Sequence, residues 1–271
     1  MKIAGMQLAV PNKISRTELM EWVSQVGRKI ETAYEQAGGF DLVVLPELSF
    51  HPYTREHFAQ LEHFAQEKTG MMFEQMARTA KHLQCAICYG YAEREGEAYY
   101  ISQAVVSKEG KLLANYRKLH IAQFGGSMEK EYFKRGNKAV TFTIDSWRFG
   151  LLICYDIRFP QLAQTLVDSG ADVILHPVAF SKDPTYPSWH SFVQTRAIEN
   201  QVYLLSVNRA GTEFGQSIFS PAWHDSEHSP SIYSESEQSN VFTLEREHLE
   251  KVRNTYQFKQ DRLTNYQQLL H

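Results

Sequence analysis

The stretch Gly-Leu-Leu-Ile-Cys-Tyr-Asp-Ile-Arg-Phe-Pro, at residues 150–160, decides how the chain is organised. Its first half is an apolar run typical of a buried strand, and the run stops at Cys154. Pro160 is placed to begin a helix, because proline is tolerated at the first helical position, where an N–H is not needed. Open α/β sheets place their chemistry at the carboxyl ends of strands. The stretch therefore predicts a strand–helix junction that carries a thiol.

A thiol at such a junction is a nucleophile when its pKa is lowered. A lone cysteine after an apolar run is, however, more often a small buried hydrophobe. The assignment of Cys154 to catalysis therefore depends on which other polar residues the chain places at strand ends.

The composition is that of an ordinary globular chain, with 271 residues and a net charge of −3. We treat residues 1–271 as one domain, with a polar C-terminal extension from about residue 256 outside the core. The charge gives no sign of a nucleic-acid partner, and no stretch is long and apolar enough to cross a membrane. The three cysteines argue against a disulfide framework, and residues 1–10 do not lead into a signal peptide. We therefore expect a cytoplasmic protein.

Strand-like and helix-like patterns alternate along the chain, which indicates the α/β class. Strands are expected at residues 2–9, 41–45, 84–92, 99–107, 111–118, 140–144, 148–153, 172–175 and 202–207, with short ones at 217–219, 231–233 and 241–244. Helices are expected at 15–37, 69–83, 160–169, 188–200 and 245–253, and Ser188 is the expected N-cap of the fourth. Tight turns at Glu109-Gly110 and Asp145-Ser146 join antiparallel strands, so the sheets should be mixed.

Polar residues stand at the carboxyl ends of three expected strands. Glu47 follows one apolar run, Lys118 ends another and Cys154 ends a third. Each alone has an ordinary interpretation, as a loop carboxylate, a solvated lysine or a buried thiol. Together they supply a base, a cation and a nucleophile, which are the parts that acyl transfer through a thioester needs.

The segments around these residues resemble the nitrilase, or carbon–nitrogen hydrolase, superfamily. Its three signature segments are matched by Leu-Pro-Glu at 45–47, Tyr-Arg-Lys-Leu-His at 116–120 and Cys-Tyr-Asp-Ile-Arg-Phe-Pro at 154–160. Arg-Ala-Ile-Glu-Asn at 196–200 and Gly-Gln-Ser at 215–217 resemble two further segments, so the resemblance covers about residues 2–222. It implies an α-β-β-α sandwich with mixed sheets, a homodimer paired through helices near Cys154, and catalysis without a metal or cofactor.

The resemblance also implies a catalytic triad of Glu47, Lys118 and Cys154. In this scheme Glu47 accepts the thiol proton, the thiolate attacks an amide carbonyl, and the departing ammonia takes the proton back. The amine of Lys118 and the backbone N–H of Tyr155 would stabilise the oxyanion that forms. Glu47 would then activate the water that hydrolyses the thioester.

Members of the superfamily often carry a second glutamate, seven residues before a glycine that precedes the next strand. Gly136 puts this glutamate at Glu129, and Glu131 is the alternative. Its implied role is to orient Lys118 or to bind the substrate nitrogen. A solvated loop carboxylate is the ordinary interpretation of either residue.

The residues after the nucleophile favour one branch of the superfamily. Tyr155-Asp156-Ile157-Arg158-Phe159 resembles the ω-amidase and deaminated-glutathione amidase group, which acts on monoamides of dicarboxylic acids. The guanidinium of Arg158 can pair bidentately with a substrate carboxylate, although Asp156 or another structural acid is an alternative partner. Phe180 and Tyr53 are expected to line the pocket, or else to belong to the core.

These observations predict hydrolysis of a small carboxylate-bearing amide to a carboxylic acid and ammonia. A nitrilase or an N-carbamoyl amidase would use the same triad, and a non-catalytic binding protein is the alternative from another class. The connection from His120 to Glu129 is short for this branch, which leaves the size of the substrate open.

Cys85 and Cys88 form a C-x-x-C pair within an expected strand. Residues three apart on a strand point to opposite faces of the sheet. We therefore expect neither a zinc site nor a disulfide at this pair.

Overall fold

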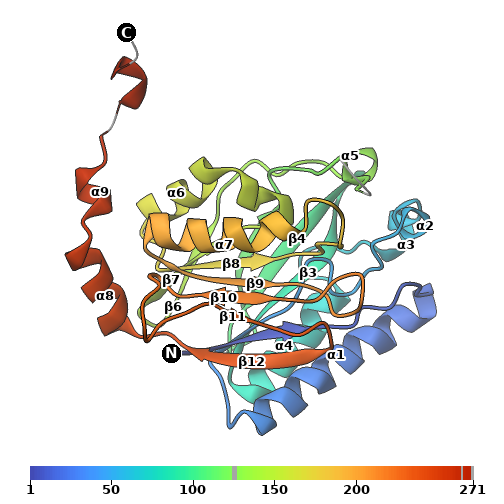
Figure 1. Ribbon diagram of the computed structural model, residues 1–271. Coiled ribbons are helices and arrows are strands. Elements are labelled where there is room, and N and C mark those ends of the chain that lie inside the picture. Colours follow the sequence, from blue (N-terminus) through green and yellow to red (C-terminus); the bar gives the residue numbers. More distant parts are fainter. Residues whose placement is uncertain (124–126, 264, 270–271) are drawn as a thin grey trace.

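Two six-stranded sheets lie face to face in the computed structural model, which describes residues 1–123, 127–263 and 265–269 (Figure 1). The first sheet has the order β12-β1-β2-β3-β4-β5, formed by β1 (Lys2–Gln7), β2 (Leu42–Val44), β3 (Ala86–Glu95), β4 (Ala98–Val106), β5 (Leu112–Arg117) and β12 (Gln238–Thr243). The second has the order β11-β10-β9-β8-β7-β6, formed by β6 (Thr141–Ile144), β7 (Trp147–Leu151), β8 (Val173–Pro177), β9 (Tyr203–Val207), β10 (Ile218–Ser220) and β11 (Ser231–Ile232).

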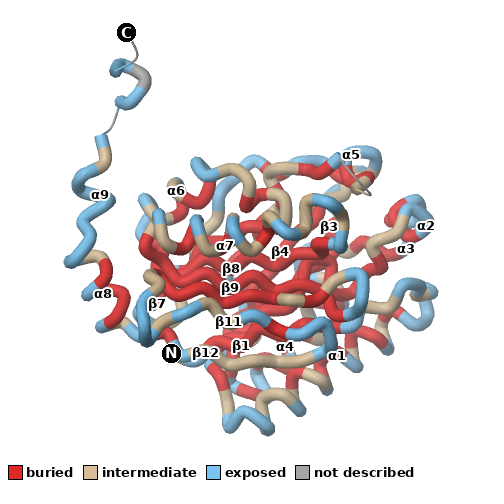
Figure 2. The backbone as a smooth tube through the Cα atoms, viewed as in Figure 1, coloured by how far each residue is buried: buried red, intermediate tan, exposed pale blue. Residues whose placement is uncertain are grey.

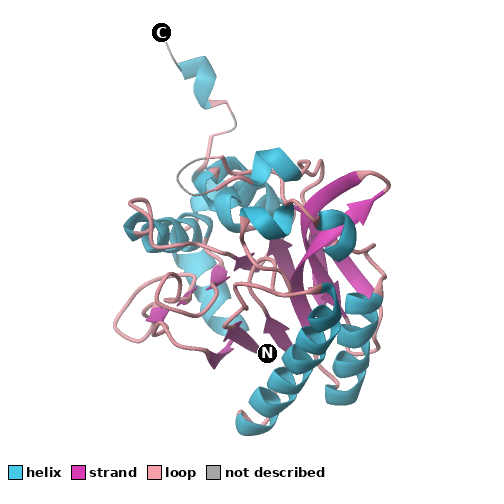
Figure 3. Cartoon of the chain, turned by 90° about the vertical axis from the view of Figure 1, so that its right-hand side faces the viewer, coloured by secondary structure: helices cyan, strands magenta, loops and turns pink. Residues whose placement is uncertain are grey.

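Helices cover the outer faces of both sheets, as the view along the sandwich in Figure 3 shows. The longer helices are α1 (Arg16–Gln36), α4 (Met71–Leu83), α6 (Pro160–Asp168), α7 (Pro187–Asn200) and α8 (Arg246–Thr255). The shorter ones are α2 (Arg55–Phe58), α3 (Leu61–Phe64), α5 (Glu129–Tyr132), α9 (Phe258–Asp261) and the 3₁₀ turns η1 (Cys154–Arg158) and η2 (Tyr266–Leu269).

Apolar contacts hold the layers together on both sides of each sheet. Leu42 and Val44 of β2 face the core between the sheets, whereas Val43 faces the helices α1 and α4, as the two-residue period of a strand requires. On the far side, Trp189 of α7 packs in one buried cluster with residues of α6 and of the second sheet. The strands are accordingly the most buried part of the chain in Figure 2. The predicted α-β-β-α sandwich is confirmed.

Most expected elements form within a few residues of their expected ends. Helix α1 begins after Ser15, whose side chain accepts a hydrogen bond from the N–H of Glu18 while the Glu18 carboxylate accepts from the N–H of Ser15. The expected N-cap of α7 is wrong. That helix begins at Pro187, which suits the first helical position, and Ser188 lies in the first turn, where its hydroxyl donates to the carbonyl of Thr185.

The two sheets repeat one arrangement at their centres. Strand β2 lies parallel to both β1 and β3, and β8 lies parallel to both β7 and β9. The segments Leu-Val-Val-Leu-Pro-Glu at 42–47 and Val-Ile-Leu-His-Pro-Val at 173–178 thus take corresponding places in the two sheets. Because β2, β8 and β9 are covered on both faces, they are mostly apolar. His176 in β8 and Ser206 in β9 are buried polar exceptions.

The C-terminal part of the chain leaves the sandwich (Figure 1). Helix α8 still buries Leu249 and Val252, but Phe258 and Leu263 beyond it are exposed. None of the helices in the described ranges combines the length and the apolar character that crossing a lipid bilayer requires.

The two cysteines of the C-x-x-C pair lie on opposite sides of the first sheet, as expected. Cys85 packs in the cluster between the first sheet and its helices, whereas Cys88 packs between the two sheets. Both are free thiols, as is Cys154.

Candidate active site

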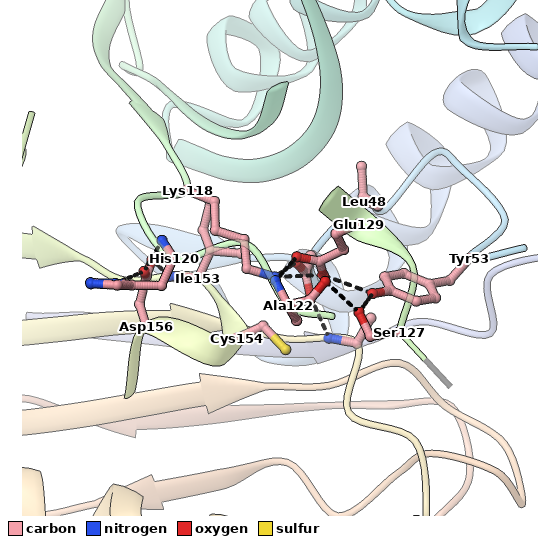
Figure 4. A network of polar contacts seen from close by, with 12 residues as sticks. Leu48, Tyr53, Lys118, His120, Ala122, Ser127, Glu129, Ile153, Cys154 and Asp156 are labelled. Carbon is pink, nitrogen blue, oxygen red and sulfur yellow. Dashed lines mark hydrogen bonds and ion pairs between the residues drawn. The ribbon is translucent and has the colours of Figure 1, made fainter. Parts of the chain in front are cut away.

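A buried lysine joins two carboxylates at the carboxyl edge of the first sheet. The Nζ atom of Lys118, directly after β5, donates to Glu47 Oε1 at 2.8 Å and to Glu129 Oε1 at 2.7 Å. The Lys118 and Glu47 side chains are fully inaccessible and that of Glu129 is 1% exposed. Figure 4 shows Lys118, Glu129 and Cys154 converging from separate segments of the chain.

Hydrogen bonds hold both the side chain and the backbone of Glu47. Its Oε2 atom accepts a hydrogen bond from the backbone N–H of Ala179 at 2.9 Å, which ties the first sheet to the loop after β8. The backbone at Leu48 has a φ of +50°, a conformation that non-glycine residues rarely adopt. This turn is held by Arg209, whose Nη2 donates to the carbonyls of Glu47, Leu48 and His51 at 3.2, 3.0 and 2.8 Å.

Arg209 is a buried residue of this site that the sequence-based expectations did not include. It lies two residues beyond β9, at the same edge of the sandwich as the other site residues, and its exposed fraction is 3%. Burial lowers its pKa to about 10. The signal was available in the sequence, because the polar pair Asn208-Arg209 ends an apolar strand just as Glu47 and Cys154 follow theirs.

Glu129 rather than Glu131 lies at this site. Glu129 Oε1 also accepts from the hydroxyl of Tyr53 at 2.7 Å, and Oε2 accepts from the N–H of Ala122 at 2.8 Å. Glu131 instead forms an exposed ion pair with Arg55. A buried carboxylate and a solvated one thus stand two residues apart on α5.

Cys154 stands in a strained turn. Its φ of +46° lies in the left-handed region, which costs a non-glycine residue of order 1–3 kcal/mol. The turn is anchored by the buried carboxylate of Asp156, which accepts from the N–H of Ile153 at 3.0 Å, the hydroxyl of Tyr116 at 2.7 Å and the N–H of His120 at 3.0 Å. The segment that carries Lys118 and the turn that carries the thiol are therefore tied together. These donors engage both oxygens of the Asp156 carboxylate.

The charges at the site act on the thiol. Burial raises the pKa of Cys154 well above its ordinary value, and Glu47 adds to the rise while Lys118 opposes it. Burial alone would lower the pKa of Lys118, but Glu129 and Glu47 outweigh it and hold that pKa well above its ordinary value. The resting site therefore contains a protonated thiol beside a charged lysine, and Cys154 needs a base to become a nucleophile.

We expect the alkylation of Cys154 by iodoacetamide to keep accelerating above pH ~8.5, where an ordinary thiol is half ionised. Because the pKa is raised, the proton stays on sulfur at neutral pH and thiolate accumulates only as the pH rises past that pKa. Rates measured between about pH 6 and pH 10, with the adduct located by mass spectrometry, would check this. A rate that levels off below about pH 8 would contradict a protonated resting thiol.

A cavity of about 180 Å³ opens onto the thiol. Its lining includes Tyr53, Glu129, Cys154, Tyr155, Phe180 and Asp183. The expected pocket residues Tyr53, Tyr155 and Phe180 thus lie on its wall. Asp183 was not anticipated, because nothing local distinguishes it from other loop acids.

Arg158 lies beside this cavity and not on its described lining. Its guanidinium carbon lies 5.8 Å from the ring centre of Phe180 and 5.6 Å from that of Phe192, and its Nη2 donates to the hydroxyl of Thr185 at 2.9 Å. The Thr185 hydroxyl in turn donates to Asp183 Oδ1 at 2.7 Å. Arg158 is therefore connected to the cavity through the ring of Phe180 and through Thr185.

A family model described as Carbon-nitrogen hydrolase matches residues 2–236 of this chain. The chain belongs to the carbon–nitrogen hydrolase family. As a hydrolase of carbon–nitrogen bonds, it requires a means of attacking the carbon and of protonating the nitrogen, and the site described above holds groups of both kinds.

This carbon–nitrogen hydrolase is similar to several other proteins. The "Hydrolase in pqqF 5'region" of Pseudomonas protegens is 34% identical over 66% of this chain, and the match spans 61% of that relative. An (R)-stereoselective amidase from a Pseudomonas species is 28% identical over 90% of both chains. Omega-amidase NIT3 of Saccharomyces cerevisiae is 29% identical over 75% of this chain and 72% of its own.

The fold agrees with a solved member of the family. The crystal structure of a carbon-nitrogen hydrolase from Helicobacter pylori superposes with a TM-score of 0.86, covering 100% of this chain and 98% of that one at 24% identity. This likeness supports the two-sheet sandwich described above.

Proposed function

We propose that this hydrolase cleaves a small linear amide to a carboxylic acid and ammonia through a thioester on Cys154. The observation that carries the proposal is the buried Lys118, held between Glu47 and Glu129 beside the thiol. Burying one cation with two carboxylates is costly, because all three groups lose their hydration. We therefore expect the protein to use this arrangement. The names of the relatives, two of which are amidases, support the same reaction class.

The chemistry follows from the positions of the charged groups. Glu47 takes the proton of Cys154 as Sγ bonds to the amide carbon, and the carbonyl oxygen becomes an oxyanion. The Lys118 amine and the N–H of Tyr155 stabilise that charge. When the C–N bond breaks, Glu47 gives its proton to the leaving ammonia.

The second half repeats these steps with water. Glu47 takes a proton from a water molecule that attacks the thioester carbon, the C–S bond breaks, and the thiolate recovers the proton from Glu47. Glu129 keeps Lys118 charged and oriented throughout, and its side chain is part of the cavity lining.

For the substrate we propose a small amide that carries a carboxylate at its other end. The guanidinium carbon of Arg158 lies 5.8 Å from the ring centre of Phe180 on the cavity wall, and an omega-amidase is among the relatives. A second candidate is an amide with a neutral or amine-bearing end, because the described lining includes Asp183 and contains no lysine or arginine.

A panel of amides separates these candidates. We expect succinamate and 2-oxoglutaramate to give kcat/KM values roughly tenfold or more above propionamide, because a charge-assisted hydrogen bond contributes ~1.5–3 kcal/mol. Ammonia release measures each rate. Arg158→Met should reduce the carboxylate-bearing amides to the level of propionamide, with propionamide itself unchanged.

Other outcomes identify the alternatives. A preference for β-alaninamide that Asp183→Asn abolishes would replace the carboxylate-bearing substrate by the amine-bearing one. Turnover of a nitrile or an N-carbamoyl amine alone would indicate the corresponding nitrilase or carbamoylase. No turnover of any compound would favour a non-catalytic binding protein.

We also propose a cytoplasmic homodimer that pairs through helices near Cys154. The free state of Cys85, Cys88 and Cys154 suits a reducing compartment, and α6 and α7 present outer faces next to the thiol. Light scattering at micromolar concentration would test the dimer, and a monomeric mass would refute it.

A further inference from the structure

A chain of hydrogen bonds runs through the second sheet to the backbone of the nucleophile. The indole Nε1 of Trp189 lies 3.1 Å from the Oγ of Ser206, and this Oγ lies 2.8 Å from Nδ1 of His176. The Nε2 atom of His176 lies 2.8 Å from the carbonyl oxygen of Cys154. His176 and Ser206 are direct neighbours on β8 and β9, and all three side chains are fully buried.

The chemistry of the groups determines the direction of every bond. An indole N–H only donates, so the Oγ of Ser206 accepts from Trp189 and is left to donate its own proton to His176. A carbonyl oxygen only accepts, so Nε2 of His176 carries the ring proton. Burial lowers the pKa of His176 to about 4, which keeps the ring neutral with its proton on Nε2.

The carbonyl at the end of this chain belongs to the peptide between Cys154 and Tyr155. The C=O and N–H of a trans peptide point in opposite directions, and no cis peptide occurs in the described residues. The bond from His176 therefore sets the direction of the Tyr155 N–H on the far side of the peptide plane. A hydrogen bond to the C=O also polarises that N–H, because linked hydrogen bonds strengthen one another.

The backbone at this peptide bond is strained and must be held in place by its surroundings. Cys154 adopts a φ of +46°, and a non-glycine residue keeps such a conformation only where its surroundings over-determine it. Asp156 restrains this turn from the side of the first sheet, and His176 restrains it from the second.

We propose that His176, supported by Ser206 and Trp189, is a positioning residue that orients and polarises the peptide whose N–H stabilises the oxyanion. This inference rests on the proposed thioester mechanism. It predicts that breaking the His176–Ser206–Trp189 hydrogen bonds slows reactions that build charge on a carbonyl oxygen. The rates of reactions that build no such charge should change little.

Two reactions of the same thiol test the proposal. Acylation of Cys154 by 4-nitrophenyl acetate passes through an oxyanion, whereas alkylation by iodoacetamide displaces iodide from carbon and forms none. We expect His176→Leu to slow acylation about 10- to 100-fold, less than the ~100- to 1,000-fold for losing an oxyanion donor outright. Alkylation should change by less than about threefold, since the thiol and Glu47 remain. Ser206→Ala should act in the same direction with a smaller effect.

Controls keep the outcome clear. His176→Gln retains a donor near the Nε2 position and should recover much of the acylation rate, whereas His190→Gln, which leaves the chain intact, should change neither rate. Because Cys85 and Cys88 are fully buried, labelling of one thiol and not three reports that each variant is folded. If His176→Leu does not fold, Ser206→Ala carries the comparison.

Parallel loss of both reactions would overturn the proposal, since it would mean that His176 only holds the sulfur in place. Unchanged acylation in His176→Leu and Ser206→Ala would overturn it as well. Failure of the mechanism itself is distinguishable, because release of 4-nitrophenol would then persist in Cys154→Ala whatever the His176 variants do.

Discussion

Cys154→Ala is expected to lower kcat for amide hydrolysis by ~10⁴-fold or more, because no other group can form the covalent intermediate. The substitution removes one sulfur from a residue that already borders a cavity, so the folded structure should persist. Ammonia release with the best amide of the panel measures the loss. Intact-mass spectrometry should detect an acyl adduct on the native chain and none on the variant.

A graded variant strengthens this test. Cys154→Ser keeps a nucleophilic atom at the same place, but a hydroxyl is harder to deprotonate than a thiol, so we expect slow acylation and an acyl adduct that persists longer. Activity retained by Cys154→Ala would remove the thioester from the mechanism and leave the lysine and carboxylates without an assigned nucleophile.

Lys118→Met is expected to remove activity and stability together. It deletes one oxyanion donor, which costs ~100- to 1,000-fold in kcat. It also strands Glu47 and Glu129 in a fully buried site, and breaking a buried ion pair from one side destabilises a protein by about 3–5 kcal/mol. Urea unfolding at neutral pH measures the second effect, and ammonia release the first.

Two controls isolate the cause. Lys182→Met removes a lysine of the same size from an exposed ion pair with Glu235, and it should cost no more than about 1 kcal/mol. The double variant Lys118→Met/Glu129→Gln leaves only the Glu47 carboxylate buried without its cation. Part of the lost stability should therefore return, while activity stays absent. If Lys118→Met unfolds at the same urea concentration as the native chain, the buried charge cluster is not as tightly coupled as its distances indicate.

The sequence left Glu131 as an alternative to Glu129. Glu129 and Glu131 stand two residues apart on one short turn, with equally polar neighbours. Their difference is that Tyr53 and Ala122, from distant parts of the chain, supply donors to the first and Arg55 meets the second at the surface. Local pattern carries no information about donors that arrive from other segments.

The short helices α2, α3 and α5 went unpredicted for a related reason. Each has four residues, too few for a helical period to be seen or for a helix to be stable alone. They form because packing holds them, as the contacts of Phe58 with Tyr53 and Phe133 illustrate.

The sequence by itself determined the strands, the longer helices, and the presence of Glu47, Lys118 and Cys154 at strand ends. These are local properties, since an apolar run between polar residues is visible wherever it occurs. Only the tertiary structure decided that Arg209 holds the turn of Glu47 and that His176 reaches the carbonyl of Cys154. Both depend on burial, because a polar side chain shielded from water must find its partners within the fold, and those partners come from other segments of the chain.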